Sequence, residues 1–242
     1  MGKRNIVVTG GSSGIGRAVA ARFAADGADV VVTGRRRDAL LAAARDVGAR
    51  AVVCDAADPA AVEAALDQLP ERIDVLVNNA GANTDLVRPD AQDLHGLAAN
   101  WQANLSANLM SAVLTTTALS DRLAAGGAVV LIGSIAADRG SRGGSYGAAK
   151  AALAAWNVDL SAELGTRQIT SNVVSPGLVV DTAFFGDQLT DERRAAQVAA
   201  TRNKREGRTA DVADAVFFLA SPGARHITGQ VLNVNGGAVT TR

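Results

Sequence analysis

Thr9-Gly10-Gly11-Ser12-Ser13-Gly14-Ile15-Gly16 is the stretch that decides the fold of this 242-residue chain. It separates a β-branched run, residues 6–9, from an Ala-rich segment, residues 15–25, and so predicts a strand, a sharp turn and a helix. Glycines bring backbone N–H groups close to an anion, and the helix N-terminus adds partial positive charge. We therefore predict that a diphosphate binds here. The expected contacts are Gly10, Ser12, Ser13, Gly14, Ile15 and Gly16.

The same strand-then-helix order repeats along the chain. Short apolar runs at 6–9, 30–33, 51–54, 73–77, 128–132, 169–174 and 230–234 alternate with helical segments at 15–25, 38–47, 59–69, 100–124, 146–164 and 211–220. Strands that are apolar at nearly every position are buried on both faces, as in a parallel sheet covered by helices. We therefore predict one α/β domain over residues 1–242, with a doubly wound parallel sheet of about seven strands and helices on both faces.

Composition narrows the class of protein. Lys+Arg and Asp+Glu both number 24, so the net charge is zero, which argues against a general nucleic-acid binder. The single cysteine, Cys54, cannot form an internal disulfide, and we expect a reducing compartment, the cytoplasm. No apolar run is long enough for a membrane span. Neither His95 nor His226 has a ligand cluster around it, so we expect no metal site.

One segment, residues 181–208, breaks the rhythm of strands and helices. It is rich in charge and carries an apolar pair, Phe184-Phe185. A long insertion before a short helix suggests a substrate lid. The alternative is a solvated surface excursion.

The end of the second predicted strand indicates which dinucleotide binds. Its sequence is Thr33-Gly34-Arg35-Arg36-Arg37, where an NAD enzyme would place a carboxylate for the adenosine ribose hydroxyls. A guanidinium suits a 2′-phosphate, so we prefer NADP(H), with Arg35 as first contact and Arg36 as second. NAD(H) remains possible, and the alternative reading is a basic helix start that is merely solvated.

Two further strand ends carry candidate cofactor contacts. Asp55 follows the third strand and could bond the adenine edge, or be an ordinary loop acid. Asn79, Ala80 and Gly81 follow the fourth strand, where amides and small residues suit close packing against a flat cofactor. Without further context this stretch would pass as a turn.

Tyr146 and Lys150 are the candidates for the chemistry. They stand at i and i+4 of a predicted helix and so share one face, and Tyr146 is the only tyrosine. A nearby ammonium favours the phenolate, so we expect Lys150 to lower the pKa of Tyr146 toward neutrality and make it an acid–base group. Ser134 ends the fifth strand, where a hydroxyl can polarise a carbonyl oxygen. Ser141 and Ser145 are poorer candidates because they lie off the strand end.

Taken together, these motifs resemble the short-chain dehydrogenase/reductase family. The resemblance covers residues 6–237 and rests on Thr9-Gly10-x-x-x-Gly14-Ile15-Gly16, Asn78-Asn79-Ala80-Gly81, Ser134, Tyr146-x-x-x-Lys150 and Ser175-Pro176-Gly177, in that order. It implies a Rossmann-type fold, a nicotinamide cofactor and hydride transfer between a carbonyl and an alcohol. It also implies a homotetramer, with a dimer possible.

The resemblance assigns a role to each matching residue. Tyr146 would be the general acid for reduction or the base for oxidation, Lys150 would bind the nicotinamide ribose, and Ser134 would bond the substrate oxygen. An asparagine would hold a water in a proton relay; Trp101 and Ser111 stand in the family's relation to Asn108, and Asn104 is the alternative. The nicotinamide-side contacts would be Pro176, Gly177, Val179 and Thr182.

These observations leave three functions open. The leading one is an NADP(H)-dependent oxidoreductase of a small carbonyl or secondary alcohol. One version of it is similar to 3-oxoacyl-carrier-protein reductases, for which Arg139 and Arg142 could form a landing patch for an acidic carrier. The second is an NAD-dependent dehydrogenase of a sugar, polyol or steroid alcohol. The third, a catalytically silent nucleotide-sensing regulator, is disfavoured by the intact Ser134, Tyr146 and Lys150.

Overall fold

A parallel sheet with the strand order β3-β2-β1-β4-β5-β6-β7 runs through the computed structural model, which describes residues 3–141, 143–182, 184, 186 and 189–240. Its strands are β1 (Asn5–Thr9), β2 (Asp29–Gly34), β3 (Arg50–Val53), β4 (Ile73–Asn78), β5 (Leu123–Ile132), β6 (Thr170–Pro176) and β7 (Val231–Val234). Each neighbouring pair among these described strands is parallel. The chain reverses direction across the sheet after β3, and this confirms the doubly wound topology predicted above.

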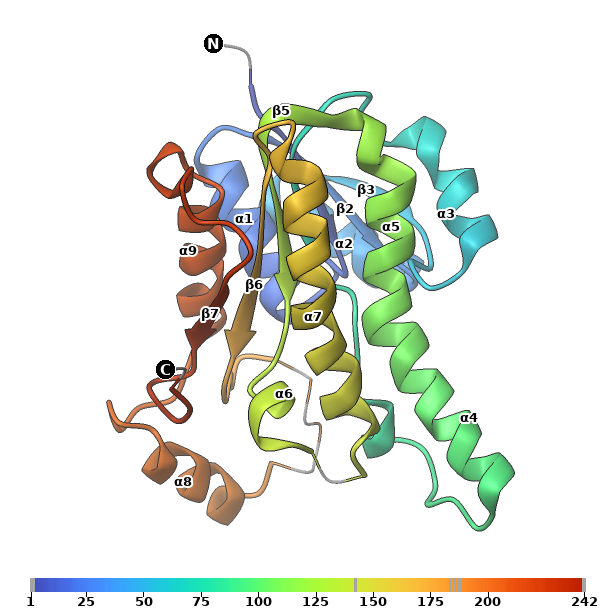
Figure 1. Cartoon of the computed structure of the whole chain (residues 1–242), viewed down its shortest axis with the longest axis vertical. Helices are drawn as coiled ribbons and strands as arrows, with labels where there is room; N and C mark the ends of the chain where they lie inside the picture. The colour runs from blue at the N-terminus through green and yellow to red at the C-terminus, as the bar shows by residue number, and fades with distance from the viewer. Residues whose placement is uncertain (1–2, 142, 183, 185, 187–188, 241–242) are drawn as a thin grey trace.

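Helices cover both faces of the sheet (Figure 1). One face packs against α1 (Gly14–Ala25), α2 (Arg37–Val47) and α9 (Thr209–Leu219). The other packs against α3 (Pro59–Ala65), α5 (Ser111–Leu119) and α7 (Ser145–Gly165).

The two cores explain why the strands are apolar at nearly every position. Ile6 and Val8 belong to the first core with Phe23, whereas Val7 belongs to the second with Leu153. Successive side chains of a strand point to opposite faces, so both sets are removed from water. Burying each such side chain contributes roughly 1.5–3 kcal/mol before entropy is counted.

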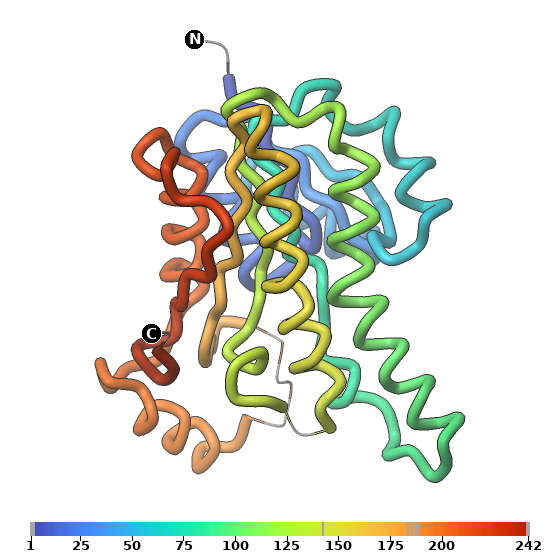
Figure 2. Tube along the Cα trace, in the orientation of Figure 1, coloured from blue at the N-terminus to red at the C-terminus, as the bar shows by residue number. Residues whose placement is uncertain are grey.

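The arrows of β5, β6 and β7 point toward the end of the molecule where α6 (Ala136–Arg139), α8 (Asp191–Ala200) and the first turns of α7 lie (Figure 1). The trace in Figure 2 shows the same grouping of these segments. Ligands of open α/β sheets bind beyond the carboxyl ends of the strands. This end of the sheet is therefore where the functional residues should gather.

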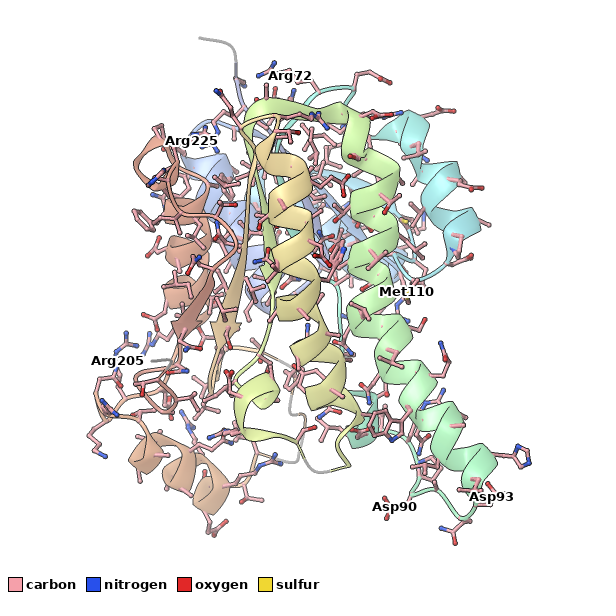
Figure 3. The ribbon with its side chains drawn as sticks, in the orientation of Figure 1. Arg72, Asp90, Asp93, Met110, Arg205 and Arg225 are labelled. Atoms are coloured by element: carbon pink, nitrogen blue, oxygen red, sulfur yellow. The ribbon has the colours of Figure 1, made fainter. Side chains whose placement is uncertain are left out.

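The helix predicted over 100–124 differs at both ends. Helix α4 (Leu94–Leu105) begins earlier, because Asp93 caps it by accepting a hydrogen bond from the Gly96 N–H at 2.7 Å. A π turn (η3, Ser106–Met110) then joins it to α5, and Met110, labelled in Figure 3, marks this turn midway along the helical rod. After a 3-10 turn, β5 begins at Leu123, which pairs with Ile73 ahead of a register shift.

The described part of the segment 181–208 includes a helix that the sequence analysis did not predict. It contains α8, whose N-cap Thr190 accepts from the Arg193 N–H at 3.2 Å. At its base Val179 pairs with Gly207. Arg194 forms a bidentate ion pair with Glu206. Two smaller differences are α6, which was not predicted, and α3, which ends at Ala65 and continues as the 3-10 turn Leu66–Gln68.

None of the helices in the described part of the chain is both long enough and apolar enough to cross a membrane.

Candidate active site

The turn between β1 and α1 has the form of an anion site. Ser13 stands at the N-cap position in extended conformation, and its side chain makes no cap hydrogen bond to the described residues. Gly10 and Gly14 have φ of +69° and +54°, a region that glycine alone adopts without strain. The side chain of Ser12 faces Gly34, with Oγ 4.0 Å from the position a Cβ there would take. An uncapped helix N-terminus after left-handed glycines fits the diphosphate of a dinucleotide.

Asn79 holds this turn against the end of β4. Its backbone N–H donates to Thr9 Oγ1 at 3.0 Å, and its Nδ2 donates to the carbonyls of Thr9 and Gly10 at 3.0 and 3.1 Å. The Ala80 N–H also donates to Thr9 Oγ1, at 2.9 Å. Asn79 was predicted as a cofactor contact; the structure gives it a bracing role as well.

Arg35, Arg36 and Asp55 lie together at the ends of β2 and β3. The Arg35 guanidinium is 3.7 Å from Asp55 Oδ2, with side chains 70% and 41% exposed, and Arg36 is the N-cap of α2. An exposed pair of this kind contributes less than about 1 kcal/mol. Arg35 can therefore leave Asp55 readily for a bound phosphate.

Ser134, Tyr146 and Lys150 converge beyond the end of β5. Tyr146 and Lys150 are both buried, one turn apart on α7. Lys150 Nζ donates to the carbonyl of Ile132 at 2.8 Å and lies 6.0 Å from the centroid of the Tyr146 ring. The Ser134 hydroxyl interacts with the Tyr146 phenol and accepts from the Ala136 N–H at 3.1 Å. The structure thus brings together the three residues that the sequence singled out.

Burial changes the ionisation of this pair in a way that the sequence did not predict. Desolvation raises the pKa of Tyr146 to about 12, with the hydrogen bond to Ser134 acting in the opposite direction. Desolvation also lowers the pKa of Lys150 to about 8. The expectation that Lys150 lowers the pKa of Tyr146 toward neutrality is therefore wrong. The low polarity of the site disfavours both the phenolate of Tyr146 and the ammonium of Lys150. The Lys150 ammonium also donates its hydrogen bond to the Ile132 carbonyl.

The lowered pKa of Lys150 predicts a pH-dependent stability. Unfolded lysine keeps its proton to pH 10.5, whereas the folded protein loses it near pH 8. The cost of burying the ammonium is therefore present in full below pH 8 and disappears between pH 8 and 10.5. We expect the free energy of unfolding to rise over that window by up to about 3 kcal/mol. Tyr146 opposes this only above pH 10, because its pKa is raised.

Urea unfolding of wild type and Lys150→Met at about pH 7.5 and about pH 9.5 measures this effect. The variant should lack the rise, because methionine keeps the apolar stem without the charge. Equal pH dependence in the two proteins would contradict a buried ammonium at Lys150.

Asn108 lies beside Lys150, in the π turn between α4 and α5. Its Nδ2 donates to the carbonyls of Ala82 at 2.7 Å and Asn104 at 3.0 Å, and its Oδ1 accepts from the Ala82 N–H at 3.2 Å. A Cβ added to Gly81 would lie 2.6 Å from Asn108 Oδ1 and 3.2 Å from Lys150 Nζ. Asn108, rather than Asn104, is therefore the asparagine next to Lys150, and π turns often occur at functional sites.

Asn104 faces a different group that the sequence analysis missed. Asp85 accepts hydrogen bonds from Asn104 Nδ2 and from the Ser145 hydroxyl. Its signal in the sequence was its position, an acid in the loop that leaves the carboxyl end of β4. Ser141 has a local role, since its hydroxyl oxygen accepts from the Gly147 N–H at 3.0 Å.

The loop after β6 reaches back to the glycine turn. Pro176 ends β6, and the Gly177 N–H donates to the carbonyl of Val234 at 3.2 Å. Val179 is buried and accepts from the Thr182 hydroxyl at 3.2 Å. The Thr182 Cγ2 methyl lies 3.2 Å from the position that a Cβ on Gly14 would take. Thr182, which follows β6, therefore lies next to Gly14 of the glycine turn that follows β1.

Phe184 brings the segment after Thr182 to the phenol. Its ring centroid is 5.7 Å from that of Tyr146, with the planes tilted by 51°. Arg139 is exposed at the end of α6. The other members of two predictions, Phe185 and Arg142, lie outside the described residues. Among the described residues, no group of three or more His, Cys, Asp or Glu side chains could hold a metal ion.

Comparison with known proteins points to one family. A family model described as enoyl-(acyl carrier protein) reductase matches residues 10–239. The chain is 35% identical to the 3-oxoacyl-[acyl-carrier-protein] reductase of Escherichia coli K12, over 96% of this chain and 95% of the relative.

Solved structures agree with this match. A short-chain type dehydrogenase/reductase from Mycobacterium ulcerans superposes with a TM-score of 0.88 at 30% identity, covering 97% of this chain and 89% of the other. A blue fluorescent protein from a metagenomic library, solved in complex with NADPH, gives a TM-score of 0.85 at 33% identity over 98% of both chains. The chain therefore belongs to the short-chain dehydrogenase/reductase family of NAD(P)(H)-dependent oxidoreductases.

Proposed function

We propose that the chain is an NADP(H)-dependent carbonyl reductase that acts through Ser134, Tyr146, Lys150 and Asn108. The observation that carries the proposal is the cluster of the buried Tyr146 and Lys150 with the partly buried Ser134 beyond the end of β5. Its neighbour is the glycine turn that fits a diphosphate. Two comparisons support it, since one similar structure holds NADPH and one relative is a 3-oxoacyl-[acyl-carrier-protein] reductase.

The cofactor would be held by the loops at this end of the sheet. The glycine turn would bind the diphosphate, Arg35 and Arg36 the 2′-phosphate, and Asp55 the adenine edge. Lys150 and Tyr146 would bind the nicotinamide ribose. The nicotinamide side would meet Asn79, Ala80, Gly81, Pro176, Gly177, Val179 and Thr182. When bound, NADPH supplies the hydride.

The chain's own residues supply the proton and hold the substrate oxygen. The Ser134 hydroxyl donates a hydrogen bond to the carbonyl oxygen and stabilises the developing alkoxide. Tyr146 then gives its phenolic proton to that oxygen, so the product is a neutral alcohol. With a pKa of about 12, the phenol carries this proton at neutral pH. The phenol is therefore in the form that donates a proton during reduction, and it would act as a base for oxidation only after losing this proton.

Two further proposals complete this function. Residues 181–208 would form the substrate lid, and the contact of Phe184 with Tyr146 supports this by placing an aromatic wall at the phenol. We also propose a homotetramer. Leu94, Leu97 and Trp101, at helical spacing on α4, are exposed apolar side chains that an interface would cover.

Arg35→Asp tests the cofactor preference. We expect the ratio of kcat/KM for NADPH over NADH to fall by roughly 10- to 100-fold, because a charge-assisted contact to the 2′-phosphate is lost. Arg45→Asp makes the same charge change in the last turn of α2 and should leave the ratio as it is. An unchanged ratio in Arg35→Asp contradicts the assignment.

An assay of the purified protein tests the activity. Simple ketones, 3-oxoacyl thioesters, and sugar, polyol and steroid alcohols would each be offered with both cofactors. We expect consumption of NADPH with carbonyl substrates. Turnover limited to NAD and alcohols would favour the dehydrogenase alternative. Tight dinucleotide binding with no turnover across the panel would favour the nucleotide-sensing regulator.

A further inference from the structure

Asp85 lies where three segments of the site meet. It belongs to the 3-10 turn Thr84–Leu86, which follows the loop of Asn79 to Gly81. Its Oδ1 accepts from Asn104 Nδ2 of α4 at 2.7 Å and from the Ser145 hydroxyl of α7 at 2.8 Å. Asn104 Nδ2 and Ser145 Oγ are themselves 2.7 Å apart. One carboxylate oxygen thus joins the β4 loop, α4 and the residue that precedes Tyr146.

The two donors to Asp85 are removed from water. Asn104 is 0% exposed and Ser145 is 1% exposed. The amide oxygen of Asn104 is also hydrogen-bonded, since Oδ1 accepts from the Thr84 N–H at 3.0 Å. Hydrogen bonds to a carboxylate are strong in such surroundings, and a buried donor that loses its acceptor is costly. The arrangement therefore has little freedom to relax around a lost carboxylate.

The hydrogen bonds continue from Asn104 to Asn108. Asn108 Nδ2 donates to the Asn104 carbonyl at 3.0 Å and to the Ala82 carbonyl at 2.7 Å. Asn108 Oδ1 is the group next to Lys150, across Gly81. A single network thus reaches Asn108, whose amide lies next to the Lys150 ammonium, and Ser145, which precedes the phenol.

Asp85 also stands at the N-terminus of α7. The N-cap of this helix is Gly144, which has no side chain to cap it. Asp85 Oδ2 lies 3.2 Å from the position that a Cβ on Gly143 would take, so a larger residue at Gly143 would press against the carboxylate. A carboxylate beside the positive end of a helix stabilises its first turn, and Tyr146 is in that turn.

We propose that Asp85, acting through Asn104 and Ser145, is a positioning residue that fixes the Tyr146 phenol and the Asn108 amide relative to Lys150. The proposal rests on the proposed function, because it assumes that Tyr146 delivers the proton. A displacement of about 1 Å at a reacting group can lower a rate about 100-fold. Loss of Asp85 should therefore lower kcat far more than it weakens the binding of NADPH or of the carbonyl substrate.

Asp85→Ala, Asp85→Asn and Ser145→Ala form the test set, assayed well below the Tm of each protein. We expect Asp85→Ala to lower kcat by roughly 30- to 100-fold, with the NADPH Kd within about threefold of wild type. Asp85→Asn keeps an acceptor oxygen and should recover most of kcat. Ser145→Ala removes one hydroxyl, should lower kcat by about 10-fold, and serves if Asp85→Ala does not fold.

Asp74→Ala is the matched control. Asp74 lies in β4, at the end of the strand opposite to the loop that carries Asp85. Its Oδ2 accepts a hydrogen bond from the Asn5 N–H at 2.8 Å. We expect this variant to lose stability and keep kcat. If Asp85→Ala behaves in the same way, Asp85 is only structural and the proposal is overturned.

Tryptophan fluorescence gives a readout that does not need activity. Trp101 Cζ2 lies 3.7 Å from the position of a Cβ on Gly144, and in a Trp156→Phe background Trp101 is the only tryptophan. Asp85→Ala should shift its emission, whereas Asp74→Ala should not. If wild type shows no turnover, the proposed function fails, and this shift then tests only the structural half of the positioning proposal, that Asp85 fixes the start of α7. An unchanged emission in folded Asp85→Ala overturns it.

Discussion

Tyr146→Phe should lower kcat by about 100- to 10,000-fold, the range that a single general acid contributes. The substitution removes the phenolic oxygen and keeps the ring, so the packing against Phe184 at 5.7 Å is retained. Because the pKa of Tyr146 is about 12, the wild-type phenol is protonated throughout the usual assay range. Reduction should therefore show no loss of activity that can be traced to Tyr146 on raising the pH to about 9. Steady-state kinetics with NADPH and the best ketone of the panel measures the effect.

Binding and stability are the controls for this substitution. The NADPH Kd should stay within about threefold, since most of the proposed cofactor contacts lie in the glycine turn and the loops after β2 and β6. The Tm should change little, because removing a buried hydroxyl also removes its desolvation cost. A Tyr146→Phe protein that still turns over at a rate near wild type would show that another group delivers the proton.

The sheet could be predicted because each strand carries its own signal. Ile6, Val7 and Val8 are all apolar, and such a β-branched run is typical of a strand buried on both faces. The glycine turn could also be predicted from a short stretch of sequence. Its residues are contiguous, and the left-handed φ at Gly10 and Gly14 is what glycine permits.

The long helix was predicted less well because its boundaries depend on other features. Its start depends on the Asp93 carboxylate, which accepts a hydrogen bond from the Gly96 N–H and lies outside the apolar periodicity of the helix. Its end depends on the pairing of Leu123 with Ile73, which is a tertiary contact. The π turn depends on the hydrogen bond from the Asn108 side chain to the Ala82 carbonyl. The spacing of apolar residues along the sequence does not reveal that contact.

The site was predicted as a set of residues but not as a set of ionisation states. The i, i+4 spacing placed Tyr146 and Lys150 on one face, yet the direction of both pKa shifts comes from burial. Asp85 was missed for a related reason. Its partner Ser145 is 60 positions away, and only the fold brings the two together.

Gly16→Ala should be the most damaging change in the glycine turn. A Cβ at Gly16 would lie 2.4 Å from Asn79 Nδ2 and 2.4 Å from the Gly10 carbonyl oxygen, closer than real contacts allow. Asn79 Nδ2 donates hydrogen bonds to the Thr9 and Gly10 carbonyls. The added methyl group must therefore push the Asn79 side chain away from the glycine turn. We expect the free energy of unfolding to fall by about 1–3 kcal/mol, as for other overpacked sites.

The same displacement should weaken NADPH binding by roughly 100-fold, because two or so charge-assisted contacts to the diphosphate lose their geometry. Gly165→Ala is the matched control, since Gly165 ends α7 and a Cβ there meets no described atom within 4 Å. That variant should bind NADPH normally and be slightly more stable. Thermal unfolding and equilibrium titration separate the two effects of Gly16→Ala. If the folded Gly16→Ala protein bound NADPH as wild type does, the diphosphate would have to lie elsewhere, and the glycine turn would be a packing device between β4 and α1.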